Sequence, residues 1–138
     1  REYEIPASFF DRLKWGEDYQ TRTGTVIENG LVTDQAPPPK SYAYSADTAY
    51  NPLVAEKVKG VDLLYHEATY LQDLEERAAK RFHCTSTQAA DIAREAGVNK
   101  LLIGHFSSKY EKLDEFEREA RMVFPNTEVA VEGVTYRV

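Results

Sequence analysis

The sequence of 138 residues is poor in cysteine and in long apolar runs, and each shortage excludes a class of protein. Cys84 is the only cysteine, so an intrachain disulfide and a four-cysteine zinc site are both excluded. No apolar run approaches the ~20 residues needed to cross a bilayer, and no basic segment followed by an apolar stretch opens the chain. We therefore expect a protein of the reducing cytoplasm that has no membrane partner.

The chain is also short of basic residues. Its 17 lysines and arginines against 23 aspartates and glutamates give a formal net charge of -6 and a pI near 5.1. This is the wrong sign for a domain that binds nucleic acid by its own charge, so a polyanionic substrate would need basic surface elsewhere. The chain begins at Arg1 rather than methionine, and we interpret it as a fragment of something longer.

Residues 1–39 differ in pattern from the rest of the chain. The dipeptide Asn29-Gly30 lies between two short apolar runs, which predicts a hairpin because Asn-Gly tolerates the positive φ of a type I′ turn. Three prolines, Pro37 to Pro39, then favour an extended connector. The sequence thus predicts an N-terminal arm over residues 1–39, with a boundary before Lys40.

From residue 40 onward, short apolar runs alternate with helical periods, which is typical of an α/β fold. Thr85 and Gln88 predict a capping box at the start of a helix, and Gly97 predicts its end. The predicted strands are 41–44, 61–65 and 101–103, with 127–131 and 134–138 as a terminal pair around Gly133. The predicted helices are 51–58, 71–81, 85–96 and 113–123.

Polar residues follow three of the predicted strands. Asp47, Glu67 and His105 each stand at or just after a strand end, and that edge is where sites form in open α/β sheets. His83, just before a helix, could join them. His66 lies within the strand pattern, so we interpret it as a hydrogen-bonded core histidine rather than a ligand.

Each of these residues also has a purely structural interpretation. Asp47 could cap the turn at Thr48, Glu67 could be a surface carboxylate, and His83 could be a loop residue beside a helix cap. His105 is the hardest to explain in this way, since a histidine after a buried strand needs a partner or a site. No single residue decides between the two interpretations.

Four short motifs together resemble those of one enzyme family. They are Ser45-Ala46-Asp47-Thr48, His66-Glu67-Ala68-Thr69, His83-Cys84-Thr85 and the run from Gly104 to Tyr110. From about Lys40 to Val138 the chain resembles the C-terminal half of ribonuclease Z, the metallo-β-lactamase-fold endonuclease that trims the 3′ end of precursor tRNA. The resemblance implies an α/β half-domain: half of an αββα sandwich, with a mixed sheet and helices on one face.

The resemblance implies a role for each candidate residue. Asp47 matches a carboxylate that bridges two zinc ions, and His105 matches a terminal ligand of one of them. Glu67 and His83 match the pair that assists the leaving 3′ oxygen, with His83 as the proton donor. Lys109 falls where the family usually has an arginine, and it implies a contact to a substrate phosphate. Two zinc ions suit such chemistry because they can clamp both sides of an in-line phosphoryl displacement.

The resemblance also implies parts that this chain lacks. The family's remaining metal ligands, its general base and its basic tRNA-binding arm belong to an N-terminal half. Asp47 and His105 alone are too few for a stable zinc site, so we expect this fragment to be inactive and to bind zinc partially or not at all. Lys109 in place of arginine keeps the charge without the bidentate fork, and Cys84 stands where the family usually has serine.

The missing half would cover one face of the sheet. We expect apolar surface to be exposed there and to drive the fragment into a homodimer. Two alternatives remain open from the sequence. One is another metallo-β-lactamase-fold hydrolase that acts on a phosphodiester or an ester. The other is a non-catalytic α/β module whose acidic surface binds a protein.

Overall fold

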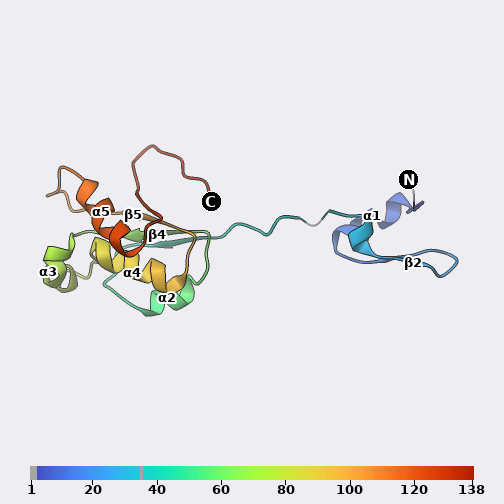
Figure 1. Cartoon of the computed structure of the whole chain (residues 1–138), viewed down its shortest axis with the longest axis horizontal. Coiled ribbons are helices and arrows are strands. Elements are labelled where there is room, and N and C mark those ends of the chain that lie inside the picture. The colour runs from blue at the N-terminus through green and yellow to red at the C-terminus, as the bar shows by residue number, and fades with distance from the viewer. Residues whose placement is uncertain (1–2, 35) are drawn as a thin grey trace. The chain divides into compact units, whose positions relative to one another are not determined.

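The computed structural model shown in Figure 1 describes residues 3–34 and 36–138. The chain divides into two units, with the division between Pro39 and Lys40. The first unit contains a 3-10 turn at Ala7–Phe9, helix α1 (Phe10–Lys14), strands β1 (Tyr19–Gln20) and β2 (Val26–Ile27), and a second 3-10 turn at Asn29–Leu31.

The hairpin of the first unit lies earlier in the chain than the sequence predicts. Strands β1 and β2 pair with each other in antiparallel fashion, and Asn29-Gly30 lies beyond them in the second 3-10 turn. The side-chain amide of Asn29 donates to the carbonyl oxygens of Leu13 at 2.8 Å and Glu17 at 3.1 Å, and its backbone N–H donates to Asp18. The predicted turn at Asn29-Gly30 is therefore wrong, because these longer-range hydrogen bonds hold Asn29 against the end of α1.

The second unit contains a four-stranded sheet in the order β3-β4-β5-β6. Its strands are β3 (Tyr42–Ser45), β4 (Leu63–Glu67), β5 (Lys100–Gly104) and β6 (Thr127–Val129). The α/β class is confirmed, but all three pairings are parallel where the family resemblance implies a mixed sheet. Parallel neighbours require long crossovers, and the helices lie in these connections. They are α2 (Leu53–Lys57), α3 (Glu75–Lys80), α4 (Ser86–Ala96) and α5 (Asp114–Val123).

The predicted terminal strand pair is wrong. Strand β6 pairs with β5, and the residues after Gly133 form no strand in the described part of the chain. Gly133 has a φ of 77°, and the Tyr136 hydroxyl accepts from the Val131 backbone N–H and donates to the Val129 carbonyl oxygen. The Tyr136 side chain thus hydrogen-bonds the C-terminal segment to the residues after β6, where the sequence predicts pairing of two strands.

The ends of α4 are as predicted. The Thr85 side chain accepts from the backbone N–H of Gln88, the Gln88 side chain accepts from that of Thr85, and Gly97 ends the helix in the left-handed conformation at a φ of 61°. The predicted helix 71–81 instead begins as a 3-10 turn at Gln72–Leu74 and becomes α3.

Within the described residues, no helix combines the length and the apolar character that crossing a membrane requires.

The hydrophobic core of the second unit lies between one face of the sheet and helices α2, α4 and α5. Leu64, Leu101 and Ile103 point into it from the two central strands. Side chains alternate along a strand, so their neighbours point to the other face. There Tyr42 and Tyr44 are 53% and 67% exposed, and Tyr44 stacks on Tyr65 with ring centroids 4.7 Å apart. This arrangement leaves an exposed aromatic surface on the side away from the helices.

Candidate metal centre

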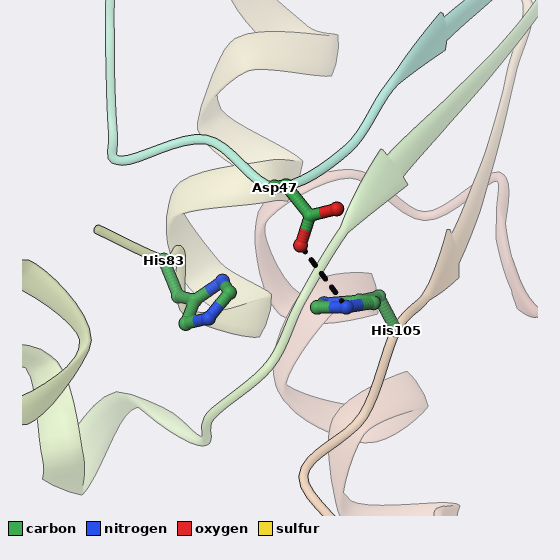
Figure 2. Close-up of side chains that lie close together, drawn as sticks. All are labelled: Asp47, His83 and His105. Carbon is green, nitrogen blue, oxygen red and sulfur yellow. Dashed lines mark ion pairs between the residues drawn. The ribbon is translucent and has the colours of Figure 1, made fainter. Parts of the chain in front are cut away.

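Two polar side chains meet at the carboxyl ends of the strands. Asp47 follows β3 by two residues and His105 follows β5 directly. Because the strands are parallel, these ends lie at the same edge of the sheet. The Nε2 atom of His105 lies 3.2 Å from Oδ1 of Asp47, as the dashed line in Figure 2 marks. The structure therefore brings together the two residues that the sequence pairs as metal ligands.

His83 joins this pair from a third loop. It lies between α3 and α4, and its ring centroid is 5.3 Å from that of His105. One potential ligand atom from each of Asp47, His83 and His105 lies within 4.8 Å of the others. Figure 2 shows the three side chains directed into a shared space. We call Asp47, His83 and His105 the triad.

The backbone of the triad region is strained. Asp47 has a φ of 49°, His105 has a φ of 60°, and Phe82, directly before His83, has a φ of 59°. Such left-handed conformations of residues other than glycine cost about 1–3 kcal/mol each, and they concentrate at functional sites. Contacts from the rest of the fold must therefore offset this strain to keep the loops in these conformations.

Glu67 is the buried centre of the polar contacts that hold the loops. It is the last residue of β4 and is fully buried. Its Oε1 accepts from the backbone N–H of Thr48 at 2.8 Å and from Nδ1 of His83 at 2.9 Å. Its Oε2 accepts from the Thr69 hydroxyl at 2.7 Å and from the backbone N–H of Cys84 at 3.0 Å. One carboxylate thereby connects the loop of Asp47 to the loop of His83.

These donors decide the charge of Glu67. Burial by itself raises the pKa of a carboxyl group, since it disfavours the charged form. The hydrogen bonds from Thr69, His83, Cys84 and Thr48 outweigh burial, so the pKa of Glu67 lies below its ordinary value. The side chain is therefore an ionised carboxylate inside the protein. The sequence alternative of a surface carboxylate is wrong for Glu67.

Cys84 adds a second link between the same loops. Its Sγ donates to the Thr48 carbonyl oxygen at 3.1 Å, next to Asp47. Burial, followed by the nearby charge of Glu67, raises the pKa of the Cys84 thiol to about 12, so it stays protonated and able to donate. The cysteine therefore supplies a donor at a position where a serine hydroxyl could also donate.

His66 lies outside the triad. It is fully buried, and its Nδ1 donates to the Glu67 carbonyl oxygen at 2.8 Å. Burial lowers the pKa of His66, which favours the neutral ring. Its Nε2 is buried and has no hydrogen-bond partner among the described residues. The interpretation of His66 as a buried, hydrogen-bonded core histidine is confirmed.

Lys109 is exposed in the loop after β5. Its Nζ lies 4.4 Å from the centroid of the Tyr110 ring, and it makes no ion pair within the described part of the chain. None of the described contacts brings it to the triad, so its phosphate role stays a prediction.

Sequence reasoning missed Thr48 and Thr69 as hydrogen-bond partners of Glu67. For Thr69, its position two residues after Glu67 was the available signal.

The donor set of the triad fits a divalent metal of the zinc type. Zinc takes carboxylate oxygen and imidazole nitrogen ligands, and the triad offers one carboxylate and two imidazoles close together. Asp47 is exposed and His105 is partly exposed, so an ion could reach them. A site with three protein ligands would also leave a position open for water or substrate.

No protein-family model matches this chain. Its sequence is 46% identical over 132 residues to Ribonuclease Z of Bacteroides fragilis (strain YCH46), a match that covers 96% of this chain and 43% of that protein. It is 43% identical over 136 residues to Ribonuclease Z of Parabacteroides distasonis, covering 99% of this chain and 45% of that protein. The chain thus spans less than half the length of these curated relatives.

Solved structures resemble the fold as well. The metallo-β-lactamase fold protein YhfI from Bacillus subtilis matches with a TM-score of 0.63 and 28% identity, over 68% of this chain and 38% of that one. The short form of human tRNase Z matches with a TM-score of 0.52 at 20% identity, over 76% of this chain and 33% of that one, which is a likeness of fold alone. The chain is therefore homologous to the C-terminal part of ribonuclease Z and has part of the metallo-β-lactamase fold.

Proposed function

We propose that this chain supplies one side of the active site of a zinc-dependent endoribonuclease that removes the 3′ trailer from precursor tRNA. The observation that carries the proposal is the triad, in which residues from three loops meet within 4.8 Å at one sheet edge. It is supported by the homology to proteins named Ribonuclease Z. The proposal covers the complete protein, in which an N-terminal half supplies the other ligands and the general base.

Asp47 and His105 are the proposed zinc ligands in this chain. Their facing atoms, Oδ1 and Nε2, are 3.2 Å apart, and both belong to ligand types that zinc accepts. When bound, two zinc ions would supply Lewis acidity toward the phosphodiester and acidify the attacking water. With His83 acting as proton donor, Asp47 and His105 alone are too few ligands for two zinc ions, so we expect the isolated chain to be inactive.

His83 is the proposed proton donor to the leaving 3′ oxygen. Its Nδ1 faces Oε1 of the ionised Glu67 at 2.9 Å, so Nδ1 carries a proton and the position of the ring is set. Nε2 is then free to hold the proton that the leaving oxygen receives as its bond to phosphorus breaks. Glu67 orients the ring and balances the charge of its protonated form.

The substrate contacts of this chain are few. Lys109 is the proposed phosphate contact, and the net charge of -6 leaves most of the tRNA binding to basic surface in the missing half. Tyr42 and Tyr44 lie on the exposed face of the sheet. We propose that the N-terminal half covers this face in the complete enzyme, which we expect to be cytoplasmic. Without it, we expect the same face to mediate a homodimer.

A second candidate is a hydrolase of small phosphodiesters, since the structural likeness to YhfI concerns the fold and leaves the substrate open. The deciding experiment offers the complete protein a precursor tRNA and bis(p-nitrophenyl) phosphate, with and without a chelator. We expect cleavage at the 3′ trailer that the chelator abolishes and zinc restores. Turnover of the small diester without cleavage of the precursor tRNA would overturn the first candidate.

A further inference from the structure

Helix α3 ends with a phenylalanine at a position where helices most often have glycine. The backbone N–H of Phe82 donates to the Ala79 carbonyl oxygen at 3.2 Å, and that of His83 donates to the Ala78 carbonyl oxygen at 2.9 Å. These two bonds form a Schellman motif, in which glycine usually takes the left-handed position because it has no Cβ. Phe82 takes that position with a φ of 59°. For so bulky a residue this backbone conformation is an outlier.

The described contacts of the Phe82 side chain do not offset this strain. The side chain is 74% exposed. Among the described residues, its ring pairs with no other aromatic ring and does not pack on the core of the second unit. A strained residue that adds nothing to packing points to a role in function.

The residues just before Phe82 form the most basic short segment of the chain. Arg77, Lys80 and Arg81 fall within five residues, and no other stretch of five residues contains three basic ones. Lys80 pairs with Glu76 at 3.8 Å. Arg81 is exposed and makes no ion pair within the part of the chain that the structure describes. A chain with a net charge of -6 thus has an exposed cation directly before an exposed aromatic ring.

This pair lies beside His83 of the triad. Consecutive Cα atoms are about 3.8 Å apart, so the Cα atoms of Arg81 and Phe82 lie within about 8 Å of that of His83. A cation and an aromatic ring are the groups with which proteins hold unpaired nucleotides, because the cation attracts a phosphate and the ring stacks on a base. The two residues therefore fit a single nucleotide next to the site of cleavage.

The role of His83 indicates which nucleotide this is. His83 is the proposed proton donor to the leaving 3′ oxygen, and that oxygen belongs to the last nucleotide of the mature tRNA. We propose that Arg81 and Phe82 bind this nucleotide, with Phe82 stacked on its base and Arg81 on a neighbouring phosphate. The inference rests on the proposed function and deepens it, since it assigns to an acidic chain a direct contact with the RNA.

Phe82 acts here as a positioning residue. The Schellman motif joins the backbones of Phe82 and His83, so a base stacked on the ring brings its own 3′ oxygen toward the proton donor. Neither Arg81 nor Phe82 takes part in the proton transfer. Both are expected to change how tightly the tRNA is held.

The test measures RNA binding by the complete protein with fluorescence anisotropy. The probes are a precursor tRNA that carries a methylene group in place of the scissile 3′ oxygen, the same tRNA ending at the cleavage point, and a precursor whose last nucleotide before the cut has no base. Phe82→Leu removes the ring, Phe82→Trp keeps an aromatic ring, and Phe82→Gly also removes the strain. Met122→Ala is the matched control, because Met122 is 76% exposed and lies on α5.

We expect Phe82→Leu and Phe82→Gly to weaken binding by about 5- to 150-fold, the loss of one stacked base, and Phe82→Trp and Met122→Ala to bind like the wild type. The loss is equal with and without the trailer. Removing the base weakens the wild type by a similar factor and adds little in Phe82→Leu. The thermal midpoint of Phe82→Gly stays the same or rises, because glycine suits the left-handed position, whereas a merely structural role for the ring would lower it.

Arg81→Gln tests the phosphate contact through its dependence on salt. Each contact to a phosphate releases counterions, so the logarithm of the binding constant falls with the logarithm of the salt concentration. We expect the slope to become shallower by about 0.7 in Arg81→Gln. Arg118→Gln removes the same charge from α5, where Arg118 pairs with Glu115, and should leave the slope unchanged. An unchanged slope in Arg81→Gln would exclude the phosphate contact.

Three results would overturn the nucleotide site: a folded Phe82→Leu with wild-type affinity, a loss of affinity confined to the RNA with a trailer, or an effect of the missing base that is undiminished in Phe82→Leu. Any of these together with normal cleavage of precursor tRNA defeats the site alone. Binding that depends on Phe82 without cleavage defeats the proposed chemistry alone. A complete protein that binds no tRNA defeats both.

Discussion

At the scale of single residues, the triad shows how local strain and buried charge combine. Asp47 and His105 hold left-handed backbone conformations, and Glu67 beneath them is a fully buried carboxylate. A buried carboxylate needs hydrogen-bond donors to offset its lost hydration, and four donors to Glu67 supply them. The loops of Asp47 and His83 are thus held by Glu67, which lies buried outside the shared space of the triad.

The roles proposed for Asp47 and His83 predict different losses. In the complete protein, Asp47→Ala removes a metal ligand, so we expect both zinc content and cleavage of precursor tRNA to be lost. His83→Ala removes a proton donor, so we expect cleavage to slow by about 10²- to 10⁴-fold with the zinc content intact. Metal analysis and single-turnover kinetics measure the two effects. Equal zinc loss in both variants would make His83 a ligand instead.

At the scale of elements, one carboxylate fastens the amino-terminal ends of three strands. Asp62, just before β4, accepts hydrogen bonds from Lys40 Nζ, from the backbone N–H and hydroxyl of Ser41 before β3, and from Asn99 Nδ2 before β5. The bond from Lys40, then those from Ser41, hold the pKa of Asp62 well below its ordinary value. Asp62 therefore links the starts of β3, β4 and β5 at the edge of the sheet opposite to the triad.

This depressed pKa predicts a pH-dependent loss of stability in Asp62→Asn. The unfolded carboxyl titrates at about 3.9, and the folded one below it, so its stabilisation is complete well above that pH and declines as the pH falls. We expect urea unfolding to show a large gap between wild type and variant at neutral pH and a smaller gap in acid. Asp91→Asn, which breaks a local ion pair with Arg94 on α4, should change little at either pH. A gap that does not narrow in acid would contradict this.

The last residue of β5 must be small because of its neighbour on β4. A methyl group on Gly104 would lie 2.8 Å from ring carbons of Tyr65, so the ring would have to move. We expect Gly104→Ala to lower the free energy of unfolding by about 1–3 kcal/mol, as overpacking does. Adding Tyr65→Ala should cost less in the Gly104→Ala background than in the wild type, and a double-mutant cycle by chemical denaturation measures this. Strict additivity would show that the two residues do not collide.

At the scale of the whole chain, the four helices described in the second unit are α2, α3, α4 and α5, and its core lies between one face of the sheet and α2, α4 and α5. Tyr42 and Tyr44 stay exposed on the other face. We expect this exposed aromatic surface to be part of an interface. The chain spans less than half the length of its curated relatives.

The exposed face predicts how the isolated chain behaves. We expect it to self-associate at high concentration, and we expect the double variant Tyr42→Lys/Tyr44→Lys to shift it toward the monomer, because charge on this face opposes its burial. Met122→Lys on α5 is the control, since Met122 is 76% exposed and lies on the helical side. Light scattering across a concentration series measures the mass. A wild-type chain that stays monomeric throughout would contradict the prediction.

The sequence by itself determined features whose signals are local. The capping box of Thr85 and Gln88, the left-handed stop at Gly97 and the apolar strand cores depend on a few neighbouring residues, so their patterns predict them. The order of the four motifs also determined the homology and the pairing of Asp47 with His105. These needed no knowledge of how distant segments pack.

Only the tertiary structure decided features that depend on distant partners. Asn29-Gly30 has a turn sequence, yet contacts to α1 hold it elsewhere, and residues 134–138 are fastened by Tyr136 rather than paired as a strand. The contact between the Thr69 hydroxyl and the His105 ring required β4 and β5 to lie side by side, since the two residues are 36 positions apart in sequence. Local propensity is worth a fraction of a kcal/mol per residue, and buried long-range hydrogen bonds and packing override it.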